Sequence, residues 1–117
     1  MSQNKGYNEF PIYYNLMRVI RDLRINNILP ISQYQCRVLL VFSVFFGTNI
    51  FTYREAHNIT KLSYGSLPIQ LSHLVRAKLI ERVKRGYYII TPSGWELINR
   101  IWSDFDRRQS KPFTLRN

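Results

Sequence analysis

Apolar side chains recur at helical spacing in the first quarter of the chain. From Glu9 onward they fall at Ile12, Leu16, Val19, Ile20, Leu23 and Ile28. This spacing of three to four residues predicts a helix from about Glu9 to Ile28, ended by Pro30. Residues 1–8 are polar and contain a glycine, so we expect a flexible N-terminus there.

The second apolar segment has almost no polar face. The run from Val38 to Phe46 is interrupted only by Ser43, and Ser32 stands before it as a candidate N-cap. A helix that is apolar nearly all round is buried. We therefore expect this helix at the centre of the core, with Gly47 as its C-cap.

A pair of shorter helices is predicted next. Ile50 and Phe51 suit a very short strand, and Thr52 with Glu55 matches the capping-box pattern of a helix that runs to about Ile59. Residues 60–65 form the turn. The second helix of the pair then runs to about residue 78, with its core face formed by Leu67, Leu71, Leu74 and Val75.

The remaining pattern changes from helix to strand and back. Residues 79–83 and 87–91 are rich in β-branched and aromatic side chains and flank Lys84-Arg85-Gly86, which predicts a β-hairpin. Thr91-Pro92 then suits the start of a last helix, to about Phe105. Its apolar stripe is formed by Trp95, Ile98, Trp102 and Phe105.

This order of elements predicts a mainly α fold with a small β-hairpin, a winged helix-turn-helix. In that architecture the second helix of the pair enters the major groove of DNA and the hairpin, or wing, reaches the neighbouring backbone or minor groove. The 117 residues suit one domain over 9–106, preceded by the flexible N-terminus (1–8) and followed by a basic tail (107–117).

The net charge of the chain indicates what kind of partner it binds. The formal net charge is +10, from 17 Lys and Arg against 7 Asp and Glu, which favours a polyanionic partner. Nucleic acid is the first choice, and an anionic membrane surface is the rival. Between Arg54 and Arg85 seven basic residues face only two acidic ones, so we expect the contact surface there. No apolar run approaches the roughly 20 residues of a membrane span, so we expect no membrane partner and a cytoplasmic, nucleoid-associated protein.

Residue types that carry other chemistry are sparse. The single cysteine, Cys36, excludes an internal disulfide and a zinc site of paired cysteines, and its place beside the apolar helix suits a core position. His57 and His73 have no acidic or thiol neighbour at ligand spacing. We therefore expect no metal, no cofactor and no enzymatic activity.

Two stretches carry a family resemblance: Leu74-Val-Arg-Ala-Lys-Leu-Ile-Glu-Arg-Val83 and Tyr87-Tyr-Ile-Ile-Thr-Pro-Ser-Gly-Trp-Glu-Leu97. Together they resemble the MarR/PadR-type winged-helix transcriptional regulators, over roughly residues 31–101. The resemblance implies a DNA-binding regulator, and it leaves room for a small-molecule effector that no residue here specifies. This sequence departs from the family pattern at Lys78, where members of that family commonly carry glycine before the Leu-Ile pair.

The resemblance places the groove-facing residues at Ser63, Tyr64, Ser66, Ile69, Gln70 and His73 of a recognition helix at about 63–78. The leucine spacing leads to a similar set without the resemblance. If Leu67, Leu71 and Leu74 face the core, the side chains that point away from it are those of Ser66, Gln70, His73 and Arg76. Gln70 suits a bidentate pair with adenine, whereas Tyr64, Ser66 and Arg76 suit phosphates. Arg54 and Lys61 flank the helix pair. The wing at 84–87 presents Lys84 and Arg85.

Pro68 lies inside this expected recognition helix. Because proline is tolerated only in a first turn, the helix either starts as late as Ser66 or kinks.

Both the first helix and the last carry more apolar residues than one face needs, which predicts a homodimer through them. Two alternatives share the fold: an accessory DNA-binding protein of a plasmid, phage or mobile element, and a winged-helix module that binds proteins.

Overall fold

The computed structural model describes the chain except for residues 1, 27–28, 64 and 117, with side chains described within 14–26, 29–63 and 65–107. Its described part is mainly helical with one small antiparallel sheet, as predicted. The order is α1 (Ser2–Ile25), α2 (Gln33–Phe46), β1 (Phe51–Thr52), α3 (Tyr53–Thr60), α4 (Leu67–Arg76), β2 (Ile80–Lys84), β3 (Tyr87–Ile90) and α5 (Pro92–Arg116). This is the order of a winged helix-turn-helix.

The first helix differs from its prediction at both ends. Helix α1 begins at Ser2, so residues 2–8 are helical where a flexible end was expected, and it stops at Ile25 instead of Ile28. Ile28 itself lies outside the described residues. A helix end without an apolar stripe gives no periodic signal, which is why the pattern missed this start. The middle of the helix packs as expected, with Val19, Ile20 and Leu23 buried.

The second helix forms the centre of the core. Ser32 accepts a hydrogen bond from the backbone N–H of Gln35 (3.2 Å), and the Gln35 side chain accepts one from the N–H of Ser32 (3.1 Å), which completes a capping box. Cys36, Leu39 and Phe42 on this helix are fully buried. Gly47 ends it with a φ of 56°, a conformation that glycine adopts without strain.

Stacked aromatic rings join α2 to the sheet. The rings of Phe46 and Phe51 lie 4.5 Å apart and nearly parallel, and Phe42 lies 4.9 Å from Phe51. The strands are ordered β1-β3-β2, all antiparallel, with Phe51 opposite Tyr88 and Ile80 opposite Ile90. The expected short strand thus becomes the third strand of the wing sheet.

The last helix starts where the sequence predicted and continues further. The Thr91 hydroxyl accepts from the N–H of Gly94 (3.0 Å) and donates to the carbonyl of Lys78 (2.7 Å), so one side chain ties the helix start to the end of α4. Helix α5 continues past Phe105 to Arg116, through the segment expected to be a tail. The polar sequence there carries no apolar stripe that would have marked a longer helix.

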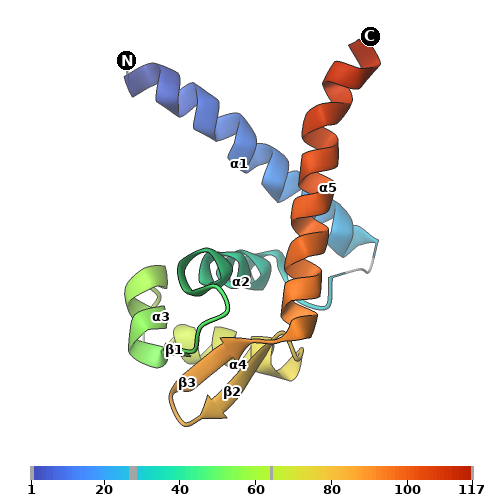
Figure 1. Ribbon diagram of the computed structural model, residues 1–117. Coiled ribbons are helices and arrows are strands. Elements are labelled where there is room, and N and C mark those ends of the chain that lie inside the picture. The colour runs from blue at the N-terminus through green and yellow to red at the C-terminus, as the bar shows by residue number, and fades with distance from the viewer. Residues whose placement is uncertain (1, 27–28, 64, 117) are drawn as a thin grey trace.

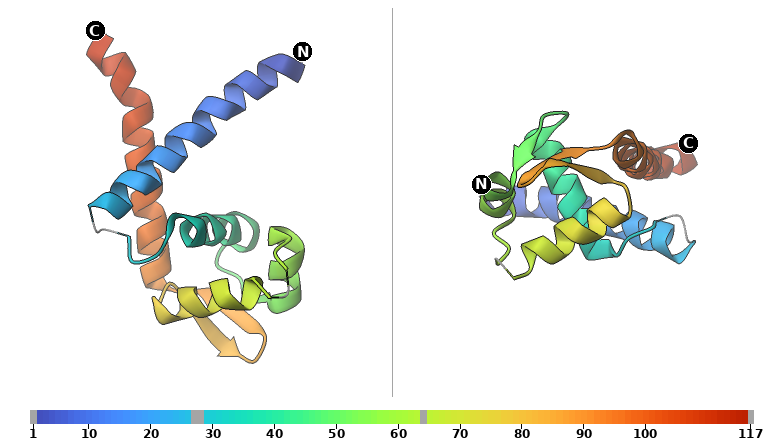
Figure 2. Two further views of the ribbon diagram at one scale, coloured as in Figure 1. Left: turned by 180° about the vertical axis from the view of Figure 1, so that it is seen from behind. Right: turned by 90° about the horizontal axis from the view of Figure 1, so that it is seen from below.

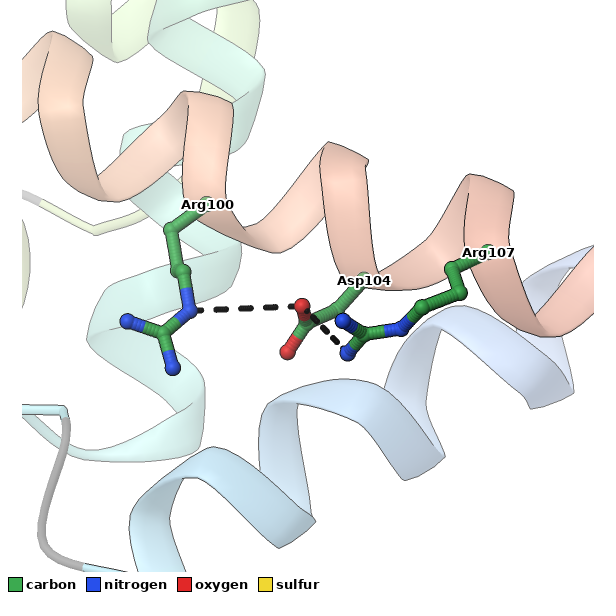
Figure 3. Close-up of polar contacts among 3 residues, drawn as sticks. All are labelled: Arg100, Asp104 and Arg107. Atoms are coloured by element: carbon green, nitrogen blue, oxygen red, sulfur yellow. Dashed lines mark hydrogen bonds and ion pairs between the residues drawn. The ribbon is translucent and has the colours of Figure 1, made fainter.

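Helices α1 and α5 pack on each other on the side of α2 opposite the hairpin, and their free ends diverge (Figure 1). Asp104 of α5 is a buried carboxylate here. Its Oδ1 atom accepts from Arg107 Nη2 at 2.8 Å and lies 3.9 Å from Arg100 Nε. Figure 3 shows these three side chains on the side of α5 that is turned towards α1. The two arginines compensate the buried charge.

The molecule therefore has two distinct ends. In Figure 1, and again from behind in Figure 2, the termini of α1 and α5 lie at one end, and α4 with the β2–β3 hairpin lies at the other. The second end holds the elements that a winged helix presents to DNA.

Candidate nucleic-acid interface

The wing is the tight connection between β2 and β3. Gly86 takes a φ of 82° there, and Lys84 and Arg85 are exposed. The Lys84 ammonium lies 4.5 Å from the centre of the Tyr87 ring, a cation–π contact that orients it. The carbonyl of Gly86 accepts from the N–H of Tyr53 (2.9 Å), so the hairpin tip is bound to the start of α3.

Helix α3 precedes the expected recognition helix and begins with a capping box. The Thr52 side chain accepts from the N–H of Glu55 (3.1 Å) and Glu55 accepts from the N–H of Thr52 (2.9 Å), so the predicted capping box is present. Arg54 is exposed in the first turn. Lys61 ends the helix in the left-handed conformation, with a φ of 60°. The two cations expected to flank the helix pair thus lie at opposite ends of α3.

The helix expected to be the recognition helix is shorter than the predicted 63–78. Helix α4 begins at Leu67 and ends at Arg76, and Pro68 lies in its first turn, where its missing N–H costs no helical hydrogen bond. Of the two alternatives that Pro68 left open, the late start is the one observed. Ser63 therefore belongs to the turn before the helix, where its hydroxyl accepts from the N–H of Ser66 (3.1 Å). Tyr64 lies outside the described residues.

The two sides of α4 divide as the leucine pattern predicted. Leu67, Leu71 and Leu74 are buried against the core. The opposite side presents residues that are exposed or partly exposed: Ser66, Ile69, Gln70, His73 and Arg76. Among the described residues, Gln70 Oε1 is the one buried side-chain polar atom without a hydrogen-bond partner. The carboxamide oxygen of Gln70 can therefore accept a hydrogen bond from a bound molecule.

A groove of about 490 Å³ separates α4 from the sheet. Its floor is apolar, from Leu71, Val75 and Pro68, and the rings of Tyr53 and Tyr88 contribute to its lining. Arg76 on α4 and Arg82 on β2 line it as well, with Ser72 between the apolar positions. Of these lining residues, Arg76 alone was among the predicted contacts, and Tyr53, Arg82 and Tyr88 come from elements where no contact was predicted outside the wing tip and Arg54. Strand alternation was the available signal, since Arg82 shares a strand face with buried Ile80 and stands opposite Tyr88.

Within the described residues no three His, Cys, Asp or Glu side chains gather into a metal site. Cys36 is buried as expected, and loss of solvation raises the pKa of its thiol from 9.0 to about 12, so the thiol stays protonated at neutral pH. No described helix combines the length and the apolar character needed to cross a membrane.

Comparison with known proteins gives one match. A family model described as "transcriptional regulator, AbiEi antitoxin" matches residues 41–91, which run from the second half of α2 through the helix pair to the end of the hairpin. No curated protein and no solved structure matched the chain. The match supports the expected class of transcriptional regulator but not the MarR/PadR group in particular, and the matched family is described as a regulator, not as an enzyme.

Proposed function

We propose that this protein binds double-stranded DNA as a transcriptional regulator, with α4 in the major groove and the wing at 84–87 on the adjacent backbone or minor groove. One observation carries the proposal. Helix α4 and the cationic hairpin lie at the same end of the molecule (Figure 1), and α4 packs directly against β2 of that hairpin. The width of the major groove admits one helix such as α4.

Gln70 is the proposed base reader. Its carboxamide oxygen has no partner in the free protein, and a buried acceptor without a donor costs about 1–3 kcal/mol. If the side chain rotates towards an adenine, the oxygen accepts from the N6 amino group and the amide nitrogen donates to N7. Adenine would satisfy the amide and relieve this cost.

The other contacts are assigned by chemistry and position. Ser66 and Arg76 suit phosphates, as does Tyr64, and Arg54 and Lys61 suit backbone at the two ends of α3. Ile69 and His73 face the groove beside Gln70, with Ser63 in the preceding turn. Lys84 and Arg85 meet the minor groove or its backbone. The same role places the protein in the cytoplasm on the nucleoid.

We further propose a homodimer through α1 and α5, so that two copies of α4 meet successive major grooves about 34 Å apart. The excess of apolar residues on both helices gives the dimer only weak support, because part of it is buried within one chain. Val19, Ile20, Ile98 and Phe105 are buried within the chain. The arrangement of the two helices supports the dimer as well, since their diverging ends point away from the α4 end. Sedimentation equilibrium would measure the mass directly, and a monomer at all concentrations contradicts the dimer.

Selection of bound duplexes from a random pool at physiological salt tests the DNA proposal. We expect an enriched sequence containing adenine, and two half-sites if the protein is a dimer. Replacing Lys84 and Arg85 by alanine should weaken binding of every duplex by a similar factor, because wing contacts to phosphate carry no sequence information. Gln70→Ala should instead relax the preference at one position. Absence of salt-sensitive duplex binding contradicts the proposal.

Each of the two alternative functions can be tested separately. An accessory protein of a plasmid, phage or mobile element would make the same contacts, and genomic neighbourhood with a promoter reporter separates it from a regulator. The description of the matched family favours the regulator. A protein-binding winged helix would leave DNA unbound and lose an acidic partner when Lys84 and Arg85 are replaced.

A further inference from the structure

The groove between α4 and the sheet has an unusual combination of an apolar floor and two cations. Arg76 and Arg82 line it, and no carboxylate does. Within the part of the chain that the structure describes, neither guanidinium forms an ion pair. Two free guanidinium groups beside one groove call for an anion, since charge-assisted hydrogen bonds to phosphate or carboxylate are the strongest that arginine makes.

The position of the groove says which anion meets it. In a duplex, the major groove and the neighbouring minor groove are separated by one sugar–phosphate strand. If α4 enters the first and the wing enters the second, that strand must cross between them, over the groove. This step rests on the proposed function. Helix α4 and the β2–β3 hairpin lie side by side at this end of the molecule (Figures 1 and 2), with the groove between α4 and the sheet.

The chemistry of the groove fits such a strand. A volume of about 490 Å³ is much larger than one phosphate needs, and its lining by Leu71, Val75 and the two tyrosine rings would stay wet under a phosphate alone. A sugar–phosphate strand alternates anions with deoxyribose rings, whose carbon faces are apolar. The rings would cover the floor while the phosphates on either side meet the two arginines.

We propose that this groove clamps the strand that divides the major from the minor groove, with Arg82 and Arg76 each neutralising a phosphate. Arg82 is then a positioning residue that sequence patterns did not select. Its role is to fix how deep α4 and the wing enter together, because phosphate contacts set register and orientation without reading bases. Since Arg82 is exposed, its replacement leaves the core intact.

The test uses the full-length protein and one 24-base-pair duplex, with affinity measured across a range of NaCl concentrations. Each phosphate contact adds about 0.9 to the slope of log affinity against log salt. We expect Arg82→Gln to lower that slope by about 1 and to weaken binding roughly tenfold on any duplex sequence. Arg82→Lys should retain the slope, since it keeps the charge. Ser72→Glu, which puts a carboxylate into the groove, should weaken binding further.

Arg24→Gln is the matched control, because it removes the same charge from an exposed position of α1, a helix that lies on the far side of α2 from the hairpin. If Arg82→Gln changes affinity and slope no more than this control, while the Lys84 and Arg85 variant still weakens binding, the clamp is wrong and the proposed function stands. If the wild-type protein binds no duplex, the proposed function itself is wrong. If benzoate binds the wild-type protein but not the Arg82→Gln variant, and wild-type protein holds benzoate and duplex at the same time without competition, the groove is a site for a free small anion and the clamp is also wrong.

Discussion

At Gly94 one hydrogen atom in place of a side chain decides how the last helix docks. A Cβ at this position would overlap the carbonyl oxygen of Leu79 and would lie 2.8 Å from Cγ2 of Ile90. The first contact is with backbone, which cannot rotate away as a side chain does. The close approach also lets Thr91 join the N–H of Gly94 to the carbonyl of Lys78. Glycine is required here by space and not by its φ angle.

Gly94→Ala should therefore destabilise the fold by about 3 kcal/mol, the upper part of the range for overpacked positions. The measurement is urea unfolding followed by circular dichroism. Gly65→Ala is the matched control, since nothing lies within 4 Å of a Cβ at that position. Equal effects at the two glycines would mean that the contact with Leu79 relaxes at no cost.

Cys36 predicts how stability depends on alkaline pH. Burial raises the pKa of its thiol from 9.0 to about 12, so folding opposes ionisation. The stabilisation is complete below pH 9, where the unfolded chain also keeps its thiol protonated, and it is lost as pH rises towards 12. Each pH unit in that window costs up to about 1.4 kcal/mol. Cys36→Ala should lack this contribution, so its stability should fall less steeply between pH 9 and 10.5.

The same burial makes the thiol unreactive at neutral pH. Iodoacetamide should label Cys36 at pH 8 only at the rate at which the protein unfolds, because the thiolate is the nucleophile and it is scarce in the native state. Fast labelling of the folded protein would contradict both the burial and the raised pKa.

At the scale of elements, the end of α4 is held by a lysine where glycine would be favoured. Lys78 has a φ of 65°; its N–H donates to the carbonyl of Val75, and the N–H of Leu79 donates to that of Leu74. This is the Schellman motif, whose left-handed residue is usually glycine. The departure from the family pattern at this position is thus a real backbone cost.

Lys78→Gly should stabilise the protein by about 1 kcal/mol, because the left-handed conformation costs an L-residue roughly that much. Lys78→Ala is the control: it removes the same charge and side chain but keeps the Cβ, so no gain is expected. A shift of the melting temperature upward for the glycine variant alone is the predicted result. Equal melting temperatures for the two variants would contradict it.

The accuracy of the sequence predictions follows from where the signals lay. The core face of α4, the central position of α2 and the N-caps Ser32 and Thr52 were predictable, because leucine spacing and capping residues are signals within a short stretch of sequence. The ends of α1 and α5 were not, since polar helix ends show no period. The late start of α4 at Leu67 was one of two options that Pro68 left open. For the candidate interface, exposed positions were found from the leucine face, whereas Arg82 needed the pairing of β2 with β3 and the packing of α4.

At the scale of the whole molecule, one net charge acts in opposite directions on folding and on binding. The charge of +10 sits on a molecule whose radius of gyration is 15.8 Å. The screening length is about 30 Å at 10 mM salt and about 10 Å at 100 mM. At the lower salt nearly all charges repel one another across the folded molecule, and at the higher salt only neighbours do. The unfolded chain holds the same charges further apart, so it suffers less at low salt.

Raising NaCl from 10 to 100 mM should therefore increase stability by on the order of 0.5–1 kcal/mol, seen as a melting temperature a few degrees higher. Over the same interval affinity for a duplex should fall, because counterions released into a more concentrated salt solution gain less entropy. Replacing Lys84 and Arg85 by glutamine removes two charges from the wing and should reduce both effects together. A melting temperature that falls with added salt would show instead that nearby carboxylates offset the positive charges. The basic excess between Arg54 and Arg85 would then not create a positive potential that attracts a polyanion.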